Sequence, residues 1–281
     1  MSASIAAAQK AGQSPPRVRL GTGSARIRRL ALRTLSVVLF FALWYAVTWL
    51  NRAAHWFNPL LLPPPDKVLE AGIELVRTGE LQHDIAASLY RVVVGFVIAS
   101  VLGVATGLLV GTWRTLEDLL DPMIELLRPI PPLAFLPMMV LWFGIGEGSK
   151  IAFIAYAAFF PVFTTTLEGI KFVDPVLLRA ASSLGATRAE MFRYVIFPAA
   201  LPAIITGLRL AFGLSFFVIV AAEFIAADSG LGYLINDART FFLVSNMLLG
   251  AAVIGIIGFT FNIALRRLEH ALLRWRRPAR P

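Results

Sequence analysis

Two ionisable residues, Arg209 and Glu223, interrupt the long apolar stretch Leu201–Ala227. The uncharged run between them covers about 20 Å of helix, which is too short to cross a bilayer core of roughly 30 Å. At least one of them must therefore lie within or close to a membrane, where ionisable groups usually mark a pathway or gate. The alternative is structural: snorkelling, or an ion pair with another helix, for example Arg91 with Glu223.

Two proline-containing stretches could also border a pathway. Thr164 and Thr165 follow Pro161, and their hydroxyls either satisfy carbonyls that this proline frees or face the pathway. The stretch Pro129–Gly146 begins in a proline-rich run and holds Pro137 as well. Because carbonyls freed in lipid must face protein or water, we expect a kinked helix packed inside a bundle.

Residues for catalysis are missing from the sequence. It has no cysteine, its three histidines are scattered, and it holds no G-x-x-x-x-G-K-[ST] phosphate loop or H-E-x-x-H motif. No carboxylate pair or Ser/His/Asp grouping presents itself either. We therefore expect no enzyme, no metal and no cofactor bound by this chain.

A polar, basic segment of about Lys171 to Ala200 separates two apolar stretches. Asp174 and the proline after it are typical of a helix start, which predicts a helix over Val176–Leu184 that ends at Gly185. Thr187-Arg188-Ala189-Glu190 is a capping-box pattern that begins a second helix. The segment predicts a helical hairpin outside the lipid, on which another protein docks.

This hairpin resembles the EAA loop of the permease subunits of bacterial ABC importers, whose pattern is E-A-A, three residues, G, nine residues and I-x-L-P. Arg179 stands where the family usually has glutamate, Val195 replaces isoleucine, and Phe197 replaces leucine. The resemblance assigns coupling to an ATPase to Arg179, Ala180, Ala181, Gly185, Ala186, Glu190 and Pro198. Two further stretches, Leu127–Gly146 and Ala222–Phe242, are similar to the nitrate/sulfonate/taurine/bicarbonate branch of that family.

The resemblance implies an all-α integral membrane protein with the type I, MetI-like importer fold. It implies partners as well: a second copy of the permease, cytoplasmic subunits that bind ATP and Mg²⁺, and a periplasmic solute-binding protein. The solute would be small, and sulfonate, taurine, nitrate, bicarbonate or a heterocycle such as a pyrimidine all stay open. The rival interpretation is a stand-alone secondary transporter or channel, which predicts mid-membrane carboxylates and internal repeats. The sequence shows one candidate carboxylate and no repeat.

Composition and charge agree with a multi-pass protein of the bacterial inner membrane. The 281 residues are 58% hydrophobic and 15% charged, with a mean hydropathy of +0.74. Six spans are expected, at Thr34–Asn51, Val92–Trp113, Pro129–Gly146, Ile151–Leu167, Leu201–Ala227 and Met247–Leu265. They place 19 basic residues on the side of both termini and the hairpin and five on the other. The positive-inside rule then puts both termini in the cytoplasm, and this explains the basic excess without nucleic acid.

We expect four parts along the chain. A disordered basic tail covers 1–30, and the first span with a periplasmic segment covers 31–84. A core of five lipid-embedded helices covers 85–266 and includes the coupling loop 171–200, and a second basic tail covers 267–281. Within the core, Gly95, Ala99, Gly103, Gly107 and Gly111 place a small residue at every fourth position, which predicts close packing of one helix face.

Overall fold

The computed structural model describes residues 22–273, which form helices and no strand. The chain divides into two compact units, 1–65 and 66–281. The first unit holds α2 (Thr22–Ala54) and a short 3₁₀ turn, η1 (Pro59–Leu61). The tail expected to be disordered is helical from Thr22 onward, a correction explained by its strong helix formers Ala, Arg and Leu. Residues 1–21 of that tail lie outside the described residues.

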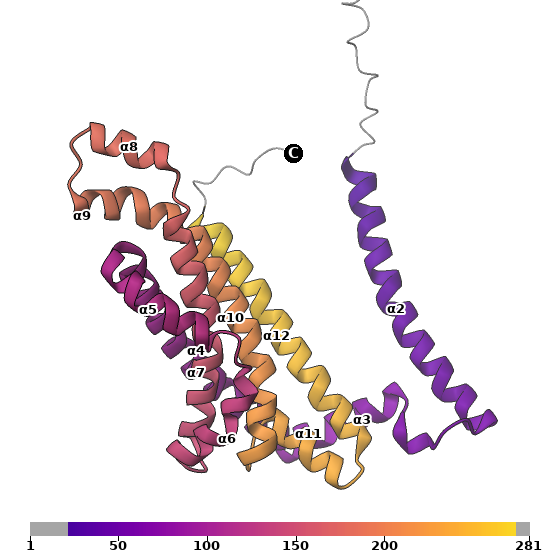
Figure 1. Cartoon of the computed structure of the whole chain (residues 1–281). Coiled ribbons are helices and arrows are strands. Elements are labelled where there is room, and N and C mark those ends of the chain that lie inside the picture. The colour runs from indigo at the N-terminus through magenta and orange to yellow at the C-terminus, as the bar shows by residue number, and fades with distance from the viewer. Residues whose placement is uncertain (1–21, 274–281) are drawn as a thin grey trace, which may run out of the picture. The chain divides into compact units, whose positions relative to one another are not determined.

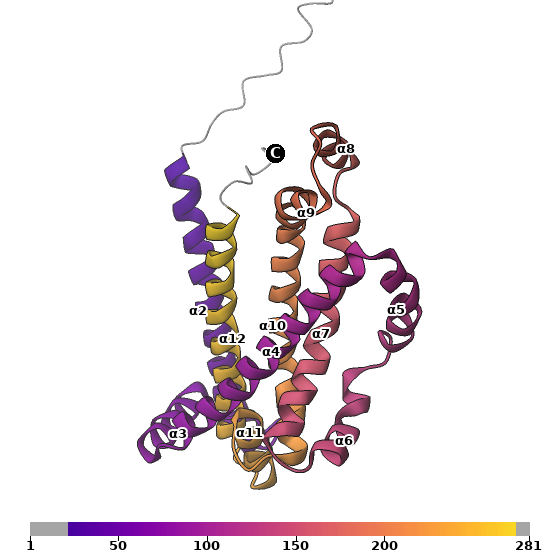
Figure 2. The same ribbon diagram turned by 90° about the vertical axis from the view of Figure 1, so that its left-hand side faces the viewer.

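The second unit is a helical bundle with a hairpin at one end (Figure 1). Its elements are α3 (Pro65–Thr78), α4 (Glu80–Thr112), α5 (Arg114–Leu127), α6 (Pro132–Phe143), α7 (Glu147–Lys171), α8 (Pro175–Ser183), α9 (Arg188–Met191), the π-helical turn η2 (Phe192–Ile196), α10 (Phe197–Ala226), α11 (Leu231–Thr240) and α12 (Val244–Leu272). The hairpin consists of α8, the turn at Gly185 and α9. The helices α3, α6 and α11 lie at the opposite end of the bundle (Figures 1 and 2).

The centre of the bundle is α7, which packs against α4 on one side and α10 on another. A Cβ atom at Gly103 would stand 2.9 Å from the Val162 side chain, and one at Gly107 would stand 2.8 Å from the Thr166 side chain. The predicted stripe of small residues on α4 is thus confirmed as a packing surface, because any larger side chain there would push α4 away from α7.

The expected third span, Pro129–Gly146, is not one helix, and this prediction is corrected. Only Pro132–Phe143 is helical, and α5 precedes it at a bend of 98°. The prolines at 129, 131 and 132 explain the break, because they remove backbone donors and restrict the residues before them. Within residues 22–273, five helices are long and apolar enough to cross a membrane, and the spans number up to six if α5 and α6 together form one broken span.

Candidate functional site

The hairpin forms from the local signals that its sequence carries. The Asp174 carboxylate accepts a hydrogen bond from the Val176 N–H at 2.8 Å and so caps α8. Thr187 and Glu190 form a reciprocal capping box at the start of α9, with distances of 2.8 and 3.3 Å. Both predicted helix starts are confirmed, and each cap satisfies a backbone donor that would otherwise lack a partner.

Gly185 ends α8 as predicted. Its φ is +78°, in the left-handed region that glycine adopts without strain. The Ala186 N–H donates to the Ala181 carbonyl at 3.1 Å, and the Gly185 N–H donates to the Ser182 carbonyl at 3.0 Å. This pair of hydrogen bonds is the Schellman motif, which reverses the chain within two residues and directs it toward α9.

One face of α8 is apolar and uncovered by the described residues. Leu184 is 88% exposed, Val176 and Leu177 are 58% and 50% exposed, and Ala180 between them is exposed as well. Arg179 is exposed, whereas Ala181 and Ala186 are half-buried. A short helix whose projecting face is apolar, with a small residue at its centre, is suited to a groove on another protein.

At the opposite end of the bundle, the buried Arg91 of α4 forms the centre of a charge cluster. Its guanidinium donates five hydrogen bonds: two to Glu147 at 2.6 and 2.7 Å, one to Glu223 at 2.7 Å, and two to Ser229 at 2.6 and 3.0 Å. These use all of its N–H groups. We call Asp84, Ser88, Arg91, Glu147, Glu223 and Ser229 the Arg91 cluster.

The same cluster caps α11. The backbone N–H groups of Gly230, Leu231 and Gly232 donate to Asp84, Ser88 and Glu223 at 2.8, 2.8 and 2.7 Å. A Cβ at Gly232 would stand 2.8 Å from the Cβ of Glu223, and Gly230 has a φ of +116°. The two glycines therefore allow the chain to turn directly over the Glu223 carboxylate.

The residues expected to form a pathway or gate are not brought together. Glu223 is paired with Arg91, the ion-pair alternative noted from the sequence, and Arg209 is paired with Glu269 of α12 at 3.0 Å. The Thr164 and Thr165 hydroxyls donate to the carbonyls of Phe160 and Pro161 at 2.8 Å. The carbonyl that Pro161 frees belongs to Ala157, so these hydroxyls do not replace the missing donor.

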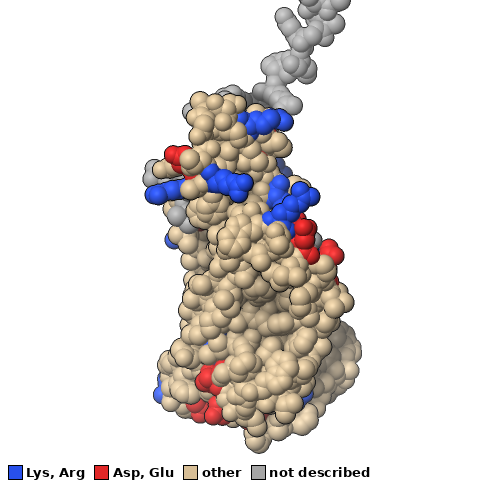
Figure 3. Space-filling model, turned by 60° about the vertical axis from the view of Figure 1, so that its left-hand side comes forward, with Lys and Arg blue, Asp and Glu red and all other residues tan. Residues whose placement is uncertain are grey.

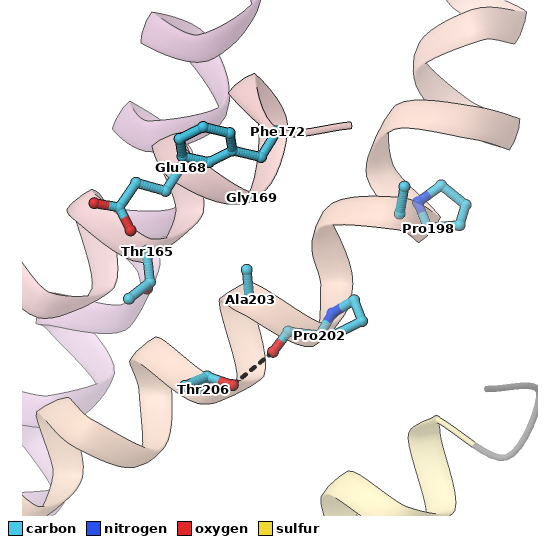
Figure 4. Close-up of a pocket in the computed structure, with 9 residues that line it drawn as sticks. Thr165, Glu168, Gly169, Phe172, Pro198, Pro202, Ala203 and Thr206 are labelled. Atoms are coloured by element: carbon cyan, nitrogen blue, oxygen red, sulfur yellow. Dashed lines mark hydrogen bonds between the residues drawn. The ribbon is translucent and has the colours of Figure 1, made fainter. Parts of the chain in front are cut away.

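Of these four residues, only Thr165 lines a cavity at the base of the hairpin (Figure 4). The cavity has a volume of about 620 Å³ and lies between the end of α7 and the start of α10. Its lining includes Glu168 and Phe172 from α7 and Pro202 and Thr206 from α10. One carboxylate and no basic side chain line it, so this cavity does not suit the retention of an anion.

Charge is distributed unevenly between the two ends of the second unit. On the face drawn in Figure 3, Lys and Arg gather at the hairpin end, and a group of Asp and Glu lies at the opposite end. Within residues 22–273, no three His, Asp or Glu side chains come together as metal ligands would.

The sequence interpretation missed most of the Arg91 cluster and the buried Lys150, which is 3% exposed and donates to Glu147 at 3.3 Å. The sequence of α4 did carry a pattern that could have revealed the Arg91 cluster. Asp84, Ser88 and Arg91 continue the small-residue face of α4 at helical spacing, so they point toward the same neighbours.

Residues 75–278 match the model of a family described as the binding-protein-dependent transport system inner membrane component. The chain is 44% identical to the taurine transport system permease protein TauC of Escherichia coli K12, covering 88% of this chain and 89% of that protein. It is 39% identical to a putative aliphatic sulfonates transport permease, SsuC of Bacillus subtilis, covering 77% of this chain and 78% of that protein. It is 36% identical to the nitrate import permease NrtB of Synechocystis, covering 74% of this chain and 79% of that protein.

Solved structures share the fold. A chain of the MetNI methionine ABC transporter in inward-facing conformations aligns with a TM-score of 0.60 at 18% identity, covering 68% of this chain and 95% of that chain. A chain of an amino acid ABC transporter aligns with a TM-score of 0.58 at 21% identity, covering 73% of this chain and 98% of that chain.

Proposed function

Because this chain belongs to the family of binding-protein-dependent transport system inner membrane components, we propose that it imports a small organosulfonate such as taurine. The chain is an ABC importer permease and a multi-pass protein of the inner membrane, and this family assignment favours it over a stand-alone secondary transporter or channel. The observation that supports the solute class is the 44% identity to a taurine permease over 88% of this chain.

The proposed assembly has two copies of this permease, two cytoplasmic ATPase subunits and a periplasmic solute-binding protein. ATP and Mg²⁺ bind to the ATPase subunits. The permease supplies no catalytic group, in keeping with its family of transport components. The bundle adopts two conformations. ATP binding favours one of them because the ATPase subunits contact that conformation more strongly than the other.

In this assembly the hairpin couples the ATPase to the bundle. The apolar face of α8, with Val176, Ala180 and Leu184 exposed, occupies a groove on the ATPase subunit. The hairpin joins α7 directly to α10, two helices that pack along one another. A displacement of α8 by the ATPase therefore shifts the ends of both central helices, and packed helices respond as units rather than by local bending.

The hairpin and the C-terminus are placed in the cytoplasm, and α3 and α11 face the periplasm. Support comes from the basic residues that gather at the hairpin end of the second unit (Figure 3). The N-terminus is placed in the cytoplasm as well, because α5 and α6 counted as one broken span give six spans, and an even number returns the chain to the side on which it began.

An uptake assay tests the solute class. The permease is reconstituted in proteoliposomes with the ATPase and binding protein encoded beside it, and radiolabelled taurine is offered outside with ATP inside. We expect ATP-dependent uptake that unlabelled alkanesulfonates reduce by competition and nitrate does not. Uptake of nitrate or bicarbonate without uptake of any sulfonate would overturn the proposed solute class and leave the family assignment intact.

A further inference from the structure

The Tyr156 hydroxyl lacks a protein partner in the middle of the bundle. Among the residues that the structure describes, every other buried side-chain nitrogen or oxygen atom has a hydrogen-bond partner, and the Tyr156 hydroxyl has none. Tyr156 lies nine residues after Glu147 at the start of α7, or about 14 Å along the helix, so it is near the centre of a bilayer core. An unpaired hydroxyl in such a place costs free energy and requires an explanation.

The neighbours of Tyr156 offer no acceptor. The Phe135 ring of α6 lies at 4.8 Å between centroids on one side, and the Phe160 ring of α7 lies at 5.3 Å on another. The phenol can donate one hydrogen bond, but the side chains that hold it in place are hydrocarbon. The two rings hold the phenol in place, and its donor is left unused by the described residues.

The second observation concerns the broken span beside it. The helix α6 has 12 residues, about 18 Å, and cannot cross the membrane alone. Its junction with α5 lies beside the middle of α7 (Figure 2), and Pro129 and Pro131 are exposed there. Irregular backbone at membrane depth is tolerated only where protein covers it or it lines a water-filled cavity. Broken helices commonly border solute sites in transporters.

The junction also carries a cation, one turn after the exposed Glu125 of α5. Arg128 ends α5 there, it is exposed, and no ion-pair partner for it occurs within residues 22–273. The oxygens of a sulfonate only accept hydrogen bonds, so they match the unused O–H donor of Tyr156.

We propose that Tyr156 contacts the solute during translocation and donates its O–H to an oxygen of the oxyanion as it passes the α5–α6 junction. This inference rests on the proposed sulfonate import. Recognition by the binding protein sets the concentration dependence of uptake, so Tyr156 acts on the maximal rate rather than on the half-saturating concentration.

The test compares Tyr156→Phe with Tyr90→Phe in the reconstituted complex. Tyr90 is 57% exposed on α4, so the same deletion of a hydroxyl there serves as the matched control. For Tyr156→Phe we expect the maximal rate of taurine uptake to fall about tenfold to a hundredfold, the range for one hydrogen bond to a charged acceptor. The half-saturating concentration stays unchanged, and Tyr90→Phe transports as wild type.

Thermal unfolding of the same purified samples separates a solute contact from a structural role. Removing a hydroxyl that has no protein partner leaves the melting temperature unchanged or raises it. Wild-type uptake by Tyr156→Phe, or a rate that falls in proportion to a lower melting temperature, would overturn the inference. If wild-type complex transports no sulfonate, the proposed solute class fails first, and the inference that rests on it fails too.

Discussion

At the residue scale, the Arg91 cluster shows why Glu223 tolerates burial. The carboxylate is fully enclosed, yet it accepts hydrogen bonds from Arg91, Ser88 and the Gly232 N–H. A buried ion pair contributes little net stability compared with apolar residues, but removal of one partner leaves an uncompensated charge. The cluster therefore fixes how α4, α7, α10 and α11 meet, and this gives Glu223 a structural reason to be present.

The first prediction follows from that pairing. Glu223→Gln should lower the free energy of unfolding by about 2 kcal/mol or more, because Arg91 loses one of its two carboxylate partners and a Gln amide cannot accept on both sides. The double variant Arg91→Met/Glu223→Met should lose less than the sum of its single variants. Denaturant unfolding of purified protein in detergent measures both.

The matched control is Glu269→Gln, which removes the partner of Arg209. The two side chains of that pair are 35% and 24% exposed, so the loss should be about 1 kcal/mol or less. If Glu223→Gln unfolds like wild type but transports poorly, Glu223 serves the pathway and the structural account is wrong.

At the element scale, the hairpin is set by local interactions. The caps at Asp174 and Thr187 and the Schellman turn at Gly185 lie within a few residues of the groups that they satisfy. A Cβ at Gly185 would meet nothing within 4 Å, so the glycine is required by its φ and not by crowding. Damage from a substitution there should stay confined to the hairpin.

The second prediction uses that confinement. Gly185→Val should abolish most transport while the protein still reaches the membrane, because a β-branched residue at positive φ costs about 1 kcal/mol or more and disturbs the docking face of α8. Gly185→Asn should retain most of the transport activity, since Asn tolerates the left-handed region. Transport and co-purification of the ATPase subunit are measured together. Normal transport and normal ATPase association in Gly185→Val would falsify the docking role of the hairpin.

At the scale of the whole molecule, orientation decides which partner meets which surface. The hairpin and α3 lie at opposite ends of the second unit (Figure 1), so they face opposite sides of the membrane if the bundle spans it. The natural sequence has no cysteine, so a single introduced cysteine reports one position without background.

The third prediction concerns Ala189 on the hairpin and Glu74 on α3, both of which are exposed. In intact cells with a permeable outer membrane, a membrane-impermeant maleimide should label a cysteine at position 74 and not one at position 189. Inverted membrane vesicles should give the reverse pattern. Labelling of both from one side would contradict the proposed orientation and the number of spans.

The sequence by itself determined the features that depend on neighbours along the chain. Composition marked a multi-pass membrane protein, and the capping residues and Gly185 placed the hairpin to within about a residue, because a cap or a turn is stabilised by groups only a few positions away. The small residues of α4 predicted a tight helix contact, but they did not name α7 as its partner.

Only the tertiary structure decided which distant groups meet. Arg91 and Glu223 are paired although 132 residues separate them, and Glu147 joins them from a third helix. Helical periodicity shows which residues share a face but not which helix covers that face. For the same reason the sequence could not show that the Tyr156 hydroxyl has no partner, or how sharply α5 and α6 bend apart. Both depend on which groups lie across the bundle.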